Sequence, residues 1–312
     1  EEEQRGDDRL GTTYRGIGPA YQDKIRRIGF RIGDLTKPRF MEKKLKFVLR
    51  LKNDVLRNLY HAEEFDEQQV LDEMLGYGKA LEPYLCDIFP LVQDALDSDR
   101  KILLEGAQGA MLDIDFGTYP YVTSSWPTAG GALTGSGIPP REVDVTMGVF
   151  KAYTTRVGYG PMPTELEGTE GDELRELGAE YGTTTGRARR VGWFDGAVAK
   201  YAARLNGLDS VALTKLDVLS DYPTIKVATG YFHRGQYLSY PVSNISHLKH
   251  CEPVYEELPG WQSPIGDARS WEDLPPNCQA YVERISEIIG APIDIISVGP
   301  SREQTVFRKL PY

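Results

Sequence analysis

Hydrophobic residues in the first third of the chain recur at helical spacing. Between residues 40 and 60 they lie three or four positions apart with Lys and Arg between them, which predicts an amphipathic helix. Similar spacing predicts further helices over 67–85 and 88–96. Residues 8–38 are rich in Gly, Thr and Arg, so we expect a loop there with at most one short helix.

Short apolar runs bounded by Gly-rich loops follow, and they are typical of buried strands. These strands are predicted at 101–104, 143–153, 210–213 and 293–297, with a helix over 278–289 before the last of them. Strands that alternate with helices predict an α/β fold with a mostly parallel central sheet flanked by helices. We expect a single domain over 1–312, in which 222–275 carry small β pieces of a peripheral subdomain.

Composition and charge narrow the classes of partner. The formal net charge is -10, from 36 basic and 46 acidic residues, so we expect neither a nucleic-acid nor a membrane partner. The sequence has no apolar run of membrane-spanning length. Its three cysteines, Cys86, Cys251 and Cys278, are widely spaced without a CxxC pair, which indicates reduced thiols and a cytoplasmic location.

The most informative motif is the turn Thr214-Lys215-Leu216-Asp217 after the apolar run 210–213. A carboxylate fixed at a strand end can accept hydrogen bonds from N1–H and the 2-amino group of guanine, a donor pair that adenine lacks. The lysine stem can cover the flat base. The alternative is an ordinary strand end with a surface lysine and a capping aspartate.

Three further loops carry groups that bind anions. Loop 11–19 combines glycines, hydroxyls and Arg15; loop 105–109 resembles a phosphate turn without a Walker lysine; and hydroxyls crowd 117–125. The stretch 183–190 places three arginines beside three threonines and a glycine, which suits a carboxylate or phosphate clamp. Each of these segments can also be a plain solvated loop.

Two other readings of the sequence are weaker. His247 and His250 lie near Cys251, but no second pair stands at zinc-ligand spacing. A nicotinamide enzyme built on the turn at Gly106 would need an acidic residue at the end of a second strand, and none stands at the expected distance. That reading would also leave the turn at Asp217 unexplained.

Taken together, long segments of the chain resemble the adenylosuccinate synthetase (IMP–aspartate ligase) family. The resemblance is carried by GTTYRGIGPAYQDKIRRIGFRIGDL at 11–35, EGAQGAMLDIDFGTYPYVTSS at 105–125, EYGTTTGRARRVGWFD at 180–195, LTKLDVL at 213–219 and IDIISVGPSREQT at 293–305. It implies a P-loop-NTPase-like fold and a GTP- and Mg²⁺-dependent ligase of AMP biosynthesis. The 6-oxygen of IMP would attack the γ-phosphate of GTP, and L-aspartate would then displace phosphate from 6-phosphoryl-IMP.

The resemblance also implies roles for individual residues. Gln108 would be catalytic, contacting the 6-oxygen of IMP, and the protein would be a homodimer in which Arg27 reaches the neighbouring subunit's IMP site. The residues implied for IMP are Thr13, Arg27, Gln108, Thr123 and Arg187. Those implied for aspartate are Thr183, Thr184, Thr185, Arg187 and Arg189. Those implied for GTP are Arg189, Lys215, Asp217, Ser297 and Gly299, with Pro300 beside them.

The sequence departs from the family pattern in four places. The family's GDEGKGK phosphate loop and the histidine of its next loop do not occur, so we expect an N-terminally incomplete chain that holds no metal ligands and is inactive by itself. The alternative function is accordingly a nucleotide-binding or dimerising fragment without catalysis. Phe116 and Trp126 stand where many members carry His and Asn, which affects the fine contacts with IMP.

Overall fold

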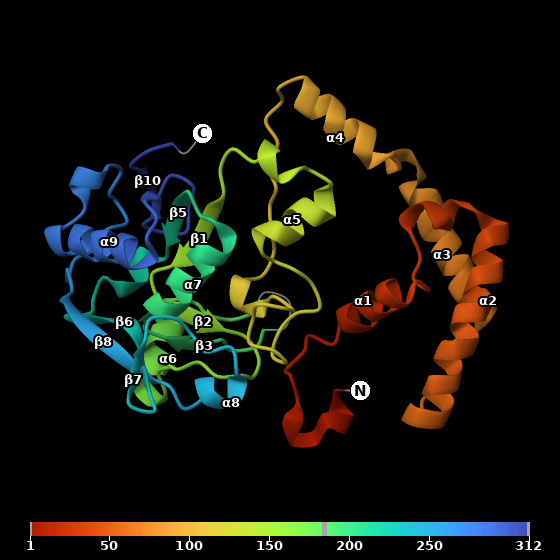
Figure 1. The fold of residues 1–312 in the computed structure, drawn as a ribbon, viewed down its shortest axis with the longest axis horizontal. Helices are drawn as coiled ribbons and strands as arrows, with labels where there is room; N and C mark the ends of the chain where they lie inside the picture. Colours follow the sequence, from red (N-terminus) through yellow and green to blue (C-terminus); the bar gives the residue numbers. More distant parts are fainter. Residues whose placement is uncertain (1, 183–185, 311–312) are drawn as a thin grey trace. The chain divides into compact units, whose positions relative to one another are not determined.

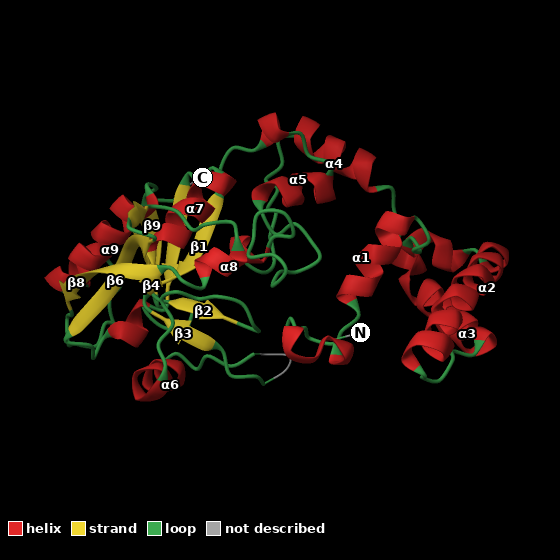
Figure 2. Ribbon diagram, turned by 60° about the horizontal axis from the view of Figure 1, so that its bottom comes forward, coloured by secondary structure: helices red, strands yellow, loops and turns green. Residues whose placement is uncertain are grey.

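The computed structural model describes residues 2–182 and 186–310, and the chain separates into two compact units. Unit 1 comprises residues 1–8 and 14–103, and unit 2 comprises residues 9–13 and 104–312. Every described strand lies in unit 2 (Figure 1 and Figure 2). The expectation of a single domain over 1–312 stays a prediction.

Unit 1 is helical, as the spacing of its apolar residues predicts. Its α-helices are α1 (Ile17–Arg26), α2 (Pro38–Val55), α3 (Glu67–Leu81) and α4 (Ile88–Asp97). Its shorter turns are η1 (Glu3–Asp8), η2 (Ile32–Thr36), η3 (Leu56–Tyr60), which continues α2, and η4 (Glu82–Tyr84). The helix expected over 67–85 ends at Leu81, because Pro83 cannot continue the α-helical hydrogen bonding and the chain tightens into η4.

The core of unit 1 forms where α2 packs against α3 and η2. Met41, Leu45 and Leu49 lie on one face of α2 and pack in one cluster with Leu35 and Leu71. Each such buried side chain contributes about 1.5–3 kcal/mol of transfer free energy. The amphipathic pattern of this segment therefore translates directly into the buried face of α2.

The main sheet of unit 2 has the strand order β1-β5-β9-β10. Its strands are β1 (Met147–Lys151), β5 (Ser210–Thr214), β9 (Ile293–Ser297) and β10 (Thr305–Phe307). β1, β5 and β9 are parallel and β10 pairs antiparallel with β9. The predicted α/β class with a mostly parallel central sheet is thus confirmed.

The other strands of unit 2 form two smaller sheets. β2 (Thr154–Arg156) pairs with β3 (Arg190–Gly192), while β6 (Thr224–His233) pairs with β4 (Phe194–Asp195), β7 (Gln236–Leu238) and β8 (Glu252–Pro259). The helices of unit 2 are α5 (Ala129–Ser136), α6 (Gly168–Leu177), α7 (Gly196–Asn206), α8 (Ile245–Leu248) and α9 (Pro276–Ile289). Short turns occur at η5 (Ala110–Leu112), η6 (Pro140–Glu142), η7 (Leu216–Leu219) and η8 (Trp271–Asp273).

One hydrophobic core links the two larger sheets of unit 2. Leu213 of β5, Ile225 of β6, Ile285 of α9 and Ile293 of β9 are fully or almost fully buried in the same cluster. α7 and α9 contact each other and lie beside these strands (Figure 1). The core therefore holds the ends of β5 and β9 in fixed positions.

The strand expected at 101–104 is wrong. These residues adopt no regular structure, and Leu103 is 87% exposed. A strand is stabilised by hydrogen bonds to a neighbouring strand, and within the described ranges none pairs with this run, so its apolar character does not suffice. None of the described helices combines the length and apolar character needed to cross a membrane.

Candidate functional site

Three loops of unit 2 meet at one edge of the main sheet. Because β1, β5 and β9 are parallel, their carboxyl ends at Lys151, Thr214 and Ser297 lie on the same edge. Lys151 and Thr214 are direct partners in the register of β1 and β5. Ligands of open α/β sheets bind outside the carboxyl ends of the strands, so this edge is the candidate site.

The turn after β5 presents Lys215 and Asp217 from a buried base. Leu216, Val218 and Leu219 are buried in the core, whereas Asp217 is half-buried. Lys215 begins the turn in the left-handed region with φ 61°. Burial raises the pKa of Asp217 above its usual value, although hydrogen bonds from its own backbone and that of Val218 and the charge of Lys215 act in the opposite direction.

The turn after β9 lies next to the one after β5. β9 contacts η7, which contains Asp217. The Ser297 hydroxyl donates to the carbonyl of Gly299 at 2.9 Å, and the Val298 amide donates to the carbonyl of Gln304 at 2.9 Å. These bonds hold the backbone near Ser297 and Gly299 in a defined shape beside the turn after β5.

A buried carboxylate, Glu180, connects this edge of the sheet to the arginine-rich loop (residues 183–190). Its Oε1 and Oε2 each lie 2.8 Å from Lys151 Nζ, and Oε2 accepts from Arg189 Nη1 at 2.7 Å. The Tyr153 hydroxyl donates to Oε1 at 2.5 Å, and Lys215 Nζ lies 3.6 Å from the same oxygen. Glu180 is completely buried, so these groups replace water around its charge.

Burial alone would raise the pKa of Glu180, but hydrogen bonds from Lys151, Tyr153 and Arg189 lower it to about 2. Burial lowers the pKa of Lys151, and the charges of Arg189 and Lys215 act in the same direction against the attraction of Glu180. The two shifts have different causes, because hydrogen bonds from the surrounding groups lower the pKa of Glu180, whereas burial and the neighbouring cations lower that of Lys151. Lys215 Nζ also donates to the carbonyl of Gly178.

The two arginines expected at the aspartate site have different surroundings. Arg189 is partly buried against Glu180, whereas Arg187 is exposed, and its Nη1 donates to the carbonyls of Gly11 and Thr12 at 3.3 and 3.4 Å. The structure therefore brings Arg187 to the segment that carries Thr13. The expected ligands Thr183, Thr184 and Thr185 lie outside the described residues.

Arg156 ties the segment before Thr13 to the loop before Thr123. Its Nη2 donates to the Thr118 hydroxyl at 3.0 Å and to the carbonyl of Tyr121 at 2.9 Å, and its Nε donates to the carbonyl of Tyr159. The Tyr159 amide in turn donates to the carbonyl of Leu10 at 3.4 Å. Burial lowers the pKa of Arg156 to about 10, with a further contribution from the charge of Arg190.

The loop that carries Thr123 is folded around the buried side chain of Asp113. Asp113 Oδ1 accepts from the amides of Asp115 and Phe116, and Oδ2 accepts from the Thr128 hydroxyl at 3.1 Å. The Thr123 amide donates to the carbonyl of Leu112 at 2.8 Å. The position of Thr123 is thus set by main-chain and carboxylate hydrogen bonds.

The two residues that depart from the family pattern lie in this same loop. Trp126 Nε1 donates to Asp115 Oδ2 at 2.6 Å, and the side chain of Phe116 is exposed. The carbonyl of Phe116 accepts from the Tyr201 hydroxyl at 2.8 Å. Trp126 therefore has a partner of its own within the loop.

The remaining predicted residues are exposed. Gln108 has a left-handed backbone with φ 63°. Arg27 belongs to unit 1, where it ends α1 with φ 63° and its amide donates to the carbonyl of Lys24 at 3.0 Å. Their roles stay predictions.

Metal ligands are a separate question. Across the described parts of the chain, no three or more His, Cys, Asp or Glu side chains are grouped so that they could hold a metal ion. The described residues therefore do not build a protein cage for Mg²⁺, an ion that proteins commonly hold through substrate phosphates and one or two carboxylates.

Sequence reasoning missed Glu180, Lys151 and Arg156. Glu180 opens the segment EYGTTTGRARR, where a single acidic residue precedes three arginines. That pattern could have indicated an internal partner for one of the arginines. Lys151 and Arg156 gave no comparable signal, because only the pairing of the strands shows which groups they face.

Comparisons with known proteins agree along almost the whole chain. The adenylosuccinate synthetase family model matches residues 1–306. The chain is 50% identical over 311 residues to the adenylosuccinate synthetase of Geotalea daltonii, covering 100% of this chain and 72% of that relative. It is 51% identical over 306 residues to that of Carboxydothermus hydrogenoformans, covering 98% of this chain and 72% of the relative.

A solved structure agrees with the fold. The structure of fully ligated adenylosuccinate synthetase from Plasmodium falciparum superposes with a TM-score of 0.93 at 38% identity, covering 98% of this chain and 72% of that one. The likeness extends over both units of the chain.

Proposed function

Since the chain belongs to the adenylosuccinate synthetase family of purine-biosynthesis ligases, we propose that it joins IMP and L-aspartate into adenylosuccinate with GTP as the phosphoryl donor. The observation that carries the proposal is the meeting of two sets of groups at the carboxyl edge of the sheet. Lys215 and Asp217 come from the turn after β5, and Arg189 comes from the arginine-rich loop, with Glu180 between them.

The guanine base would lie against the turn after β5. The Asp217 carboxylate would accept from N1–H and the 2-amino group, while the stem of Lys215 covers the base. Ser297 and Gly299 on the neighbouring turn would offer backbone groups to the other edge of the base. Support comes from the contact of β9 with η7 and from the buried residues on both sides of Asp217.

IMP would bind between the segments that carry Thr13 and Thr123, whose hydroxyls would hold its phosphate. Arg187 would add a guanidinium here, a role supported by its bonds to the carbonyls of Gly11 and Thr12. We further propose a homodimer in which Arg27 reaches the IMP of the neighbouring subunit. Arg27 is exposed, as that role requires.

L-Aspartate would bind at the arginine-rich loop through Thr183–Thr185, Arg187 and Arg189. The ligand has two carboxylates, and guanidinium groups pair with carboxylates through two parallel hydrogen bonds. Arg189 would also face the GTP side, since its guanidinium shares Glu180 with Lys215.

The chemistry would proceed in two balanced steps. The 6-oxygen of IMP forms a bond to the γ-phosphorus of GTP while the bond to GDP breaks and the N1 proton of IMP passes to a general base, which we assign to none of the described residues; Gln108 donates a hydrogen bond to that oxygen as its charge changes. The neutral amino group of aspartate then forms a bond to C6, inorganic phosphate leaves with the 6-oxygen, and the amino nitrogen gives up one proton to solvent. Arg187 and Arg189 orient the aspartate for this second step.

Mg²⁺ would neutralise the phosphates of GTP during the first step. None of its ligands is assigned to the described residues. A cytoplasmic location is also part of the proposal, and it is supported by the free thiols of Cys86, Cys251 and Cys278. The comparisons give no support to the alternative of a binding fragment without catalysis.

The test is a substrate-omission assay with the purified protein in its full natural length. IMP, GTP, Mg²⁺ and L-aspartate together are expected to yield adenylosuccinate, GDP and phosphate in equal amounts. Omission of IMP, GTP or Mg²⁺ is expected to abolish all three products, whereas omission of L-aspartate is expected to abolish adenylosuccinate and phosphate and to limit GDP to about one equivalent per active site. Replacing GTP by ATP is the matched control for the base. Equal turnover with ATP, or GTP hydrolysis without adenylosuccinate, would contradict the proposal.

A further inference from the structure

The cluster around Glu180 draws its members from three separate segments of unit 2. Lys151 and Tyr153 belong to the end of β1 and the segment just after it, Arg189 belongs to the arginine-rich loop, and Lys215 begins the turn after β5. All of them approach the two oxygens of one completely buried side chain. One carboxylate therefore connects these three segments of unit 2.

Glu180 fixes Arg189 by its backbone as well as by its side chain. The Arg189 amide donates to the carbonyl of Glu180 at 2.8 Å, and Arg189 Nη1 donates to its carboxylate at 2.7 Å. The Gly182 amide donates to the carbonyl of Arg187 at 2.8 Å, and Tyr181 and Ala188 form an antiparallel bridge, so both arginines lie on the segment that returns beside Glu180. Glu180 thus stands at the base of the arginine-rich loop.

The charges of the cluster do not cancel. Lys151, Arg189 and Lys215 bring three positive charges to the carboxylate of Glu180, and their side chains are only 26%, 26% and 36% exposed. The charge of Lys215 also acts on the half-buried Asp217, so the group keeps an excess of one positive charge even when this second carboxylate is counted. A purely structural ion cluster in such a place would be close to neutral, because unbalanced charge away from water is costly. An excess of positive charge is stabilised when an anion arrives, and both nucleotide phosphates and aspartate are anions.

Resting on the proposed function, we propose that Glu180 is a positioning residue that couples the turn after β5, where guanine would bind, to the arginine-rich loop. It holds Lys215 and Arg189 with the same two oxygens. When one ligand draws its cation toward itself, Glu180 keeps only the other cation and holds it in a single orientation, so less conformational freedom is lost when the second ligand binds. GTP and L-aspartate should then bind cooperatively, although they contact different segments.

The coupling can be measured as a ratio of dissociation constants. The affinity of a non-hydrolysable GTP analogue is determined calorimetrically with IMP present, with and without L-aspartate. Coupling between sites is typically ~5- to 150-fold, and we expect at least the lower end for the native protein. In Glu180→Gln, which keeps the shape but removes the charge, the ratio is expected to fall close to one.

Glu256→Gln is the matched control. Glu256 on β8 forms an ion pair with Arg284 on α9. The variant therefore breaks an ion pair that contacts none of the proposed ligand residues. This variant should keep the native ratio, whatever its effect on stability. Loss of coupling in both variants would reduce Glu180 to an ordinary structural ion pair and overturn the proposal.

Other outcomes are equally decisive. A folded Glu180→Gln with native coupling overturns the proposal, whereas a native protein that does not bind the GTP analogue overturns the proposed function instead. If Glu180→Gln does not fold, Tyr153→Phe removes the 2.5 Å hydrogen bond that orients the same carboxylate and keeps all three cations. This variant is expected to lower the coupling severalfold, and unchanged coupling in it would overturn the proposal.

Discussion

Replacing Asp217 with Asn should change which base the protein accepts. The carboxylate can accept from two donors of guanine, while the amide of Asn offers one acceptor and one donor. That pattern fits xanthine, which carries an oxygen in place of the 2-amino group. We therefore expect Asp217→Asn to lose GTP and to gain xanthosine triphosphate.

The structure sets the size of the effect. A hydrogen bond to a charged group contributes about 1.5–3 kcal/mol, but Asp217 is only half-buried, so water compensates part of its loss. For the pair of bonds we take ~2–3 kcal/mol, which corresponds to a loss of about 30- to 150-fold in kcat/KM for GTP. Leu216, Val218 and Leu219 remain buried, so the fold of the turn should not change.

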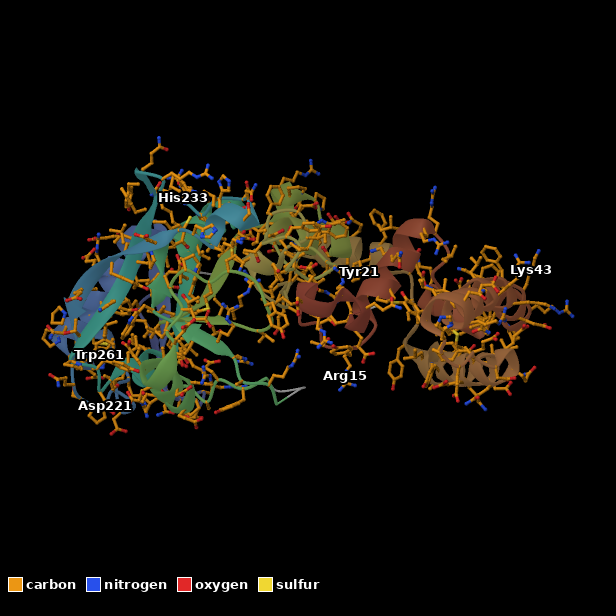
Figure 3. The ribbon with its side chains drawn as sticks, turned by 90° about the horizontal axis from the view of Figure 1, so that it is seen from below. Arg15, Tyr21, Lys43, Asp221, His233 and Trp261 are labelled. Atoms are coloured by element: carbon orange, nitrogen blue, oxygen red, sulfur yellow. The ribbon has the colours of Figure 1, made fainter. Side chains whose placement is uncertain are left out.

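The assay compares kcat/KM for GTP and xanthosine triphosphate in the native protein and the variant. Asp221→Asn is the control, because Asp221 is an exposed carboxylate just beyond the same turn, near Trp261, whose Nε1 donates to the hydroxyl of Ser220 (Figure 3). The control should keep the native preference. If Asp217→Asn keeps it too, Asp217 does not read the base and the reasoning about this turn is refuted.

Two further predictions concern stability and thiol reactivity. The pKa of Glu180 is lowered from 4.5 to about 2, so its charge stabilises the fold above pH 4.5, and this contribution is lost as the pH falls toward 2. The difference in the free energy of unfolding between the native protein and Glu180→Gln, measured with urea, should therefore shrink by about 3 kcal/mol across that window. A difference that stays constant with pH would contradict the assignment. Cys86 is exposed, whereas burial raises the pKa of Cys251 and raises that of Cys278 to about 12. An alkylating reagent at neutral pH should therefore label Cys86 alone in the folded protein, which mass spectrometry can measure. Equally fast labelling of Cys278 would contradict its burial.

Local pattern was enough to predict much of the fold. The helices α2, α3 and α4 follow from apolar spacing, and β5 and β9 follow from short apolar runs next to Gly-rich or polar turns. The run at 101–104 has the same local character as β5 but lacks a paired neighbour, and its side chains are exposed. Whether an apolar run becomes a strand depends on residues far away in the chain, which local pattern does not contain.

The candidate site divides in the same way. The place of Asp217 after a buried strand could be predicted, because the strand and the turn are both visible in consecutive residues, and its role stays a prediction. Glu180 could not, because its meaning comes from Lys151 and Lys215, which are 29 and 35 positions away in opposite directions along the chain. Groups that act through partners on other strands become recognisable only once the strands are paired.

The alternation of buried and half-buried residues in η7 has an evolutionary consequence. Leu216 and Val218 lock the backbone on both sides of Asp217, so the side chain at 217 can be exchanged while its neighbours keep their places. A lineage could therefore adopt another nucleobase through one substitution, without rebuilding the scaffold. Conversely, a smaller side chain at position 216 should reduce the selectivity for one base at a loss of stability too small to unfold the protein.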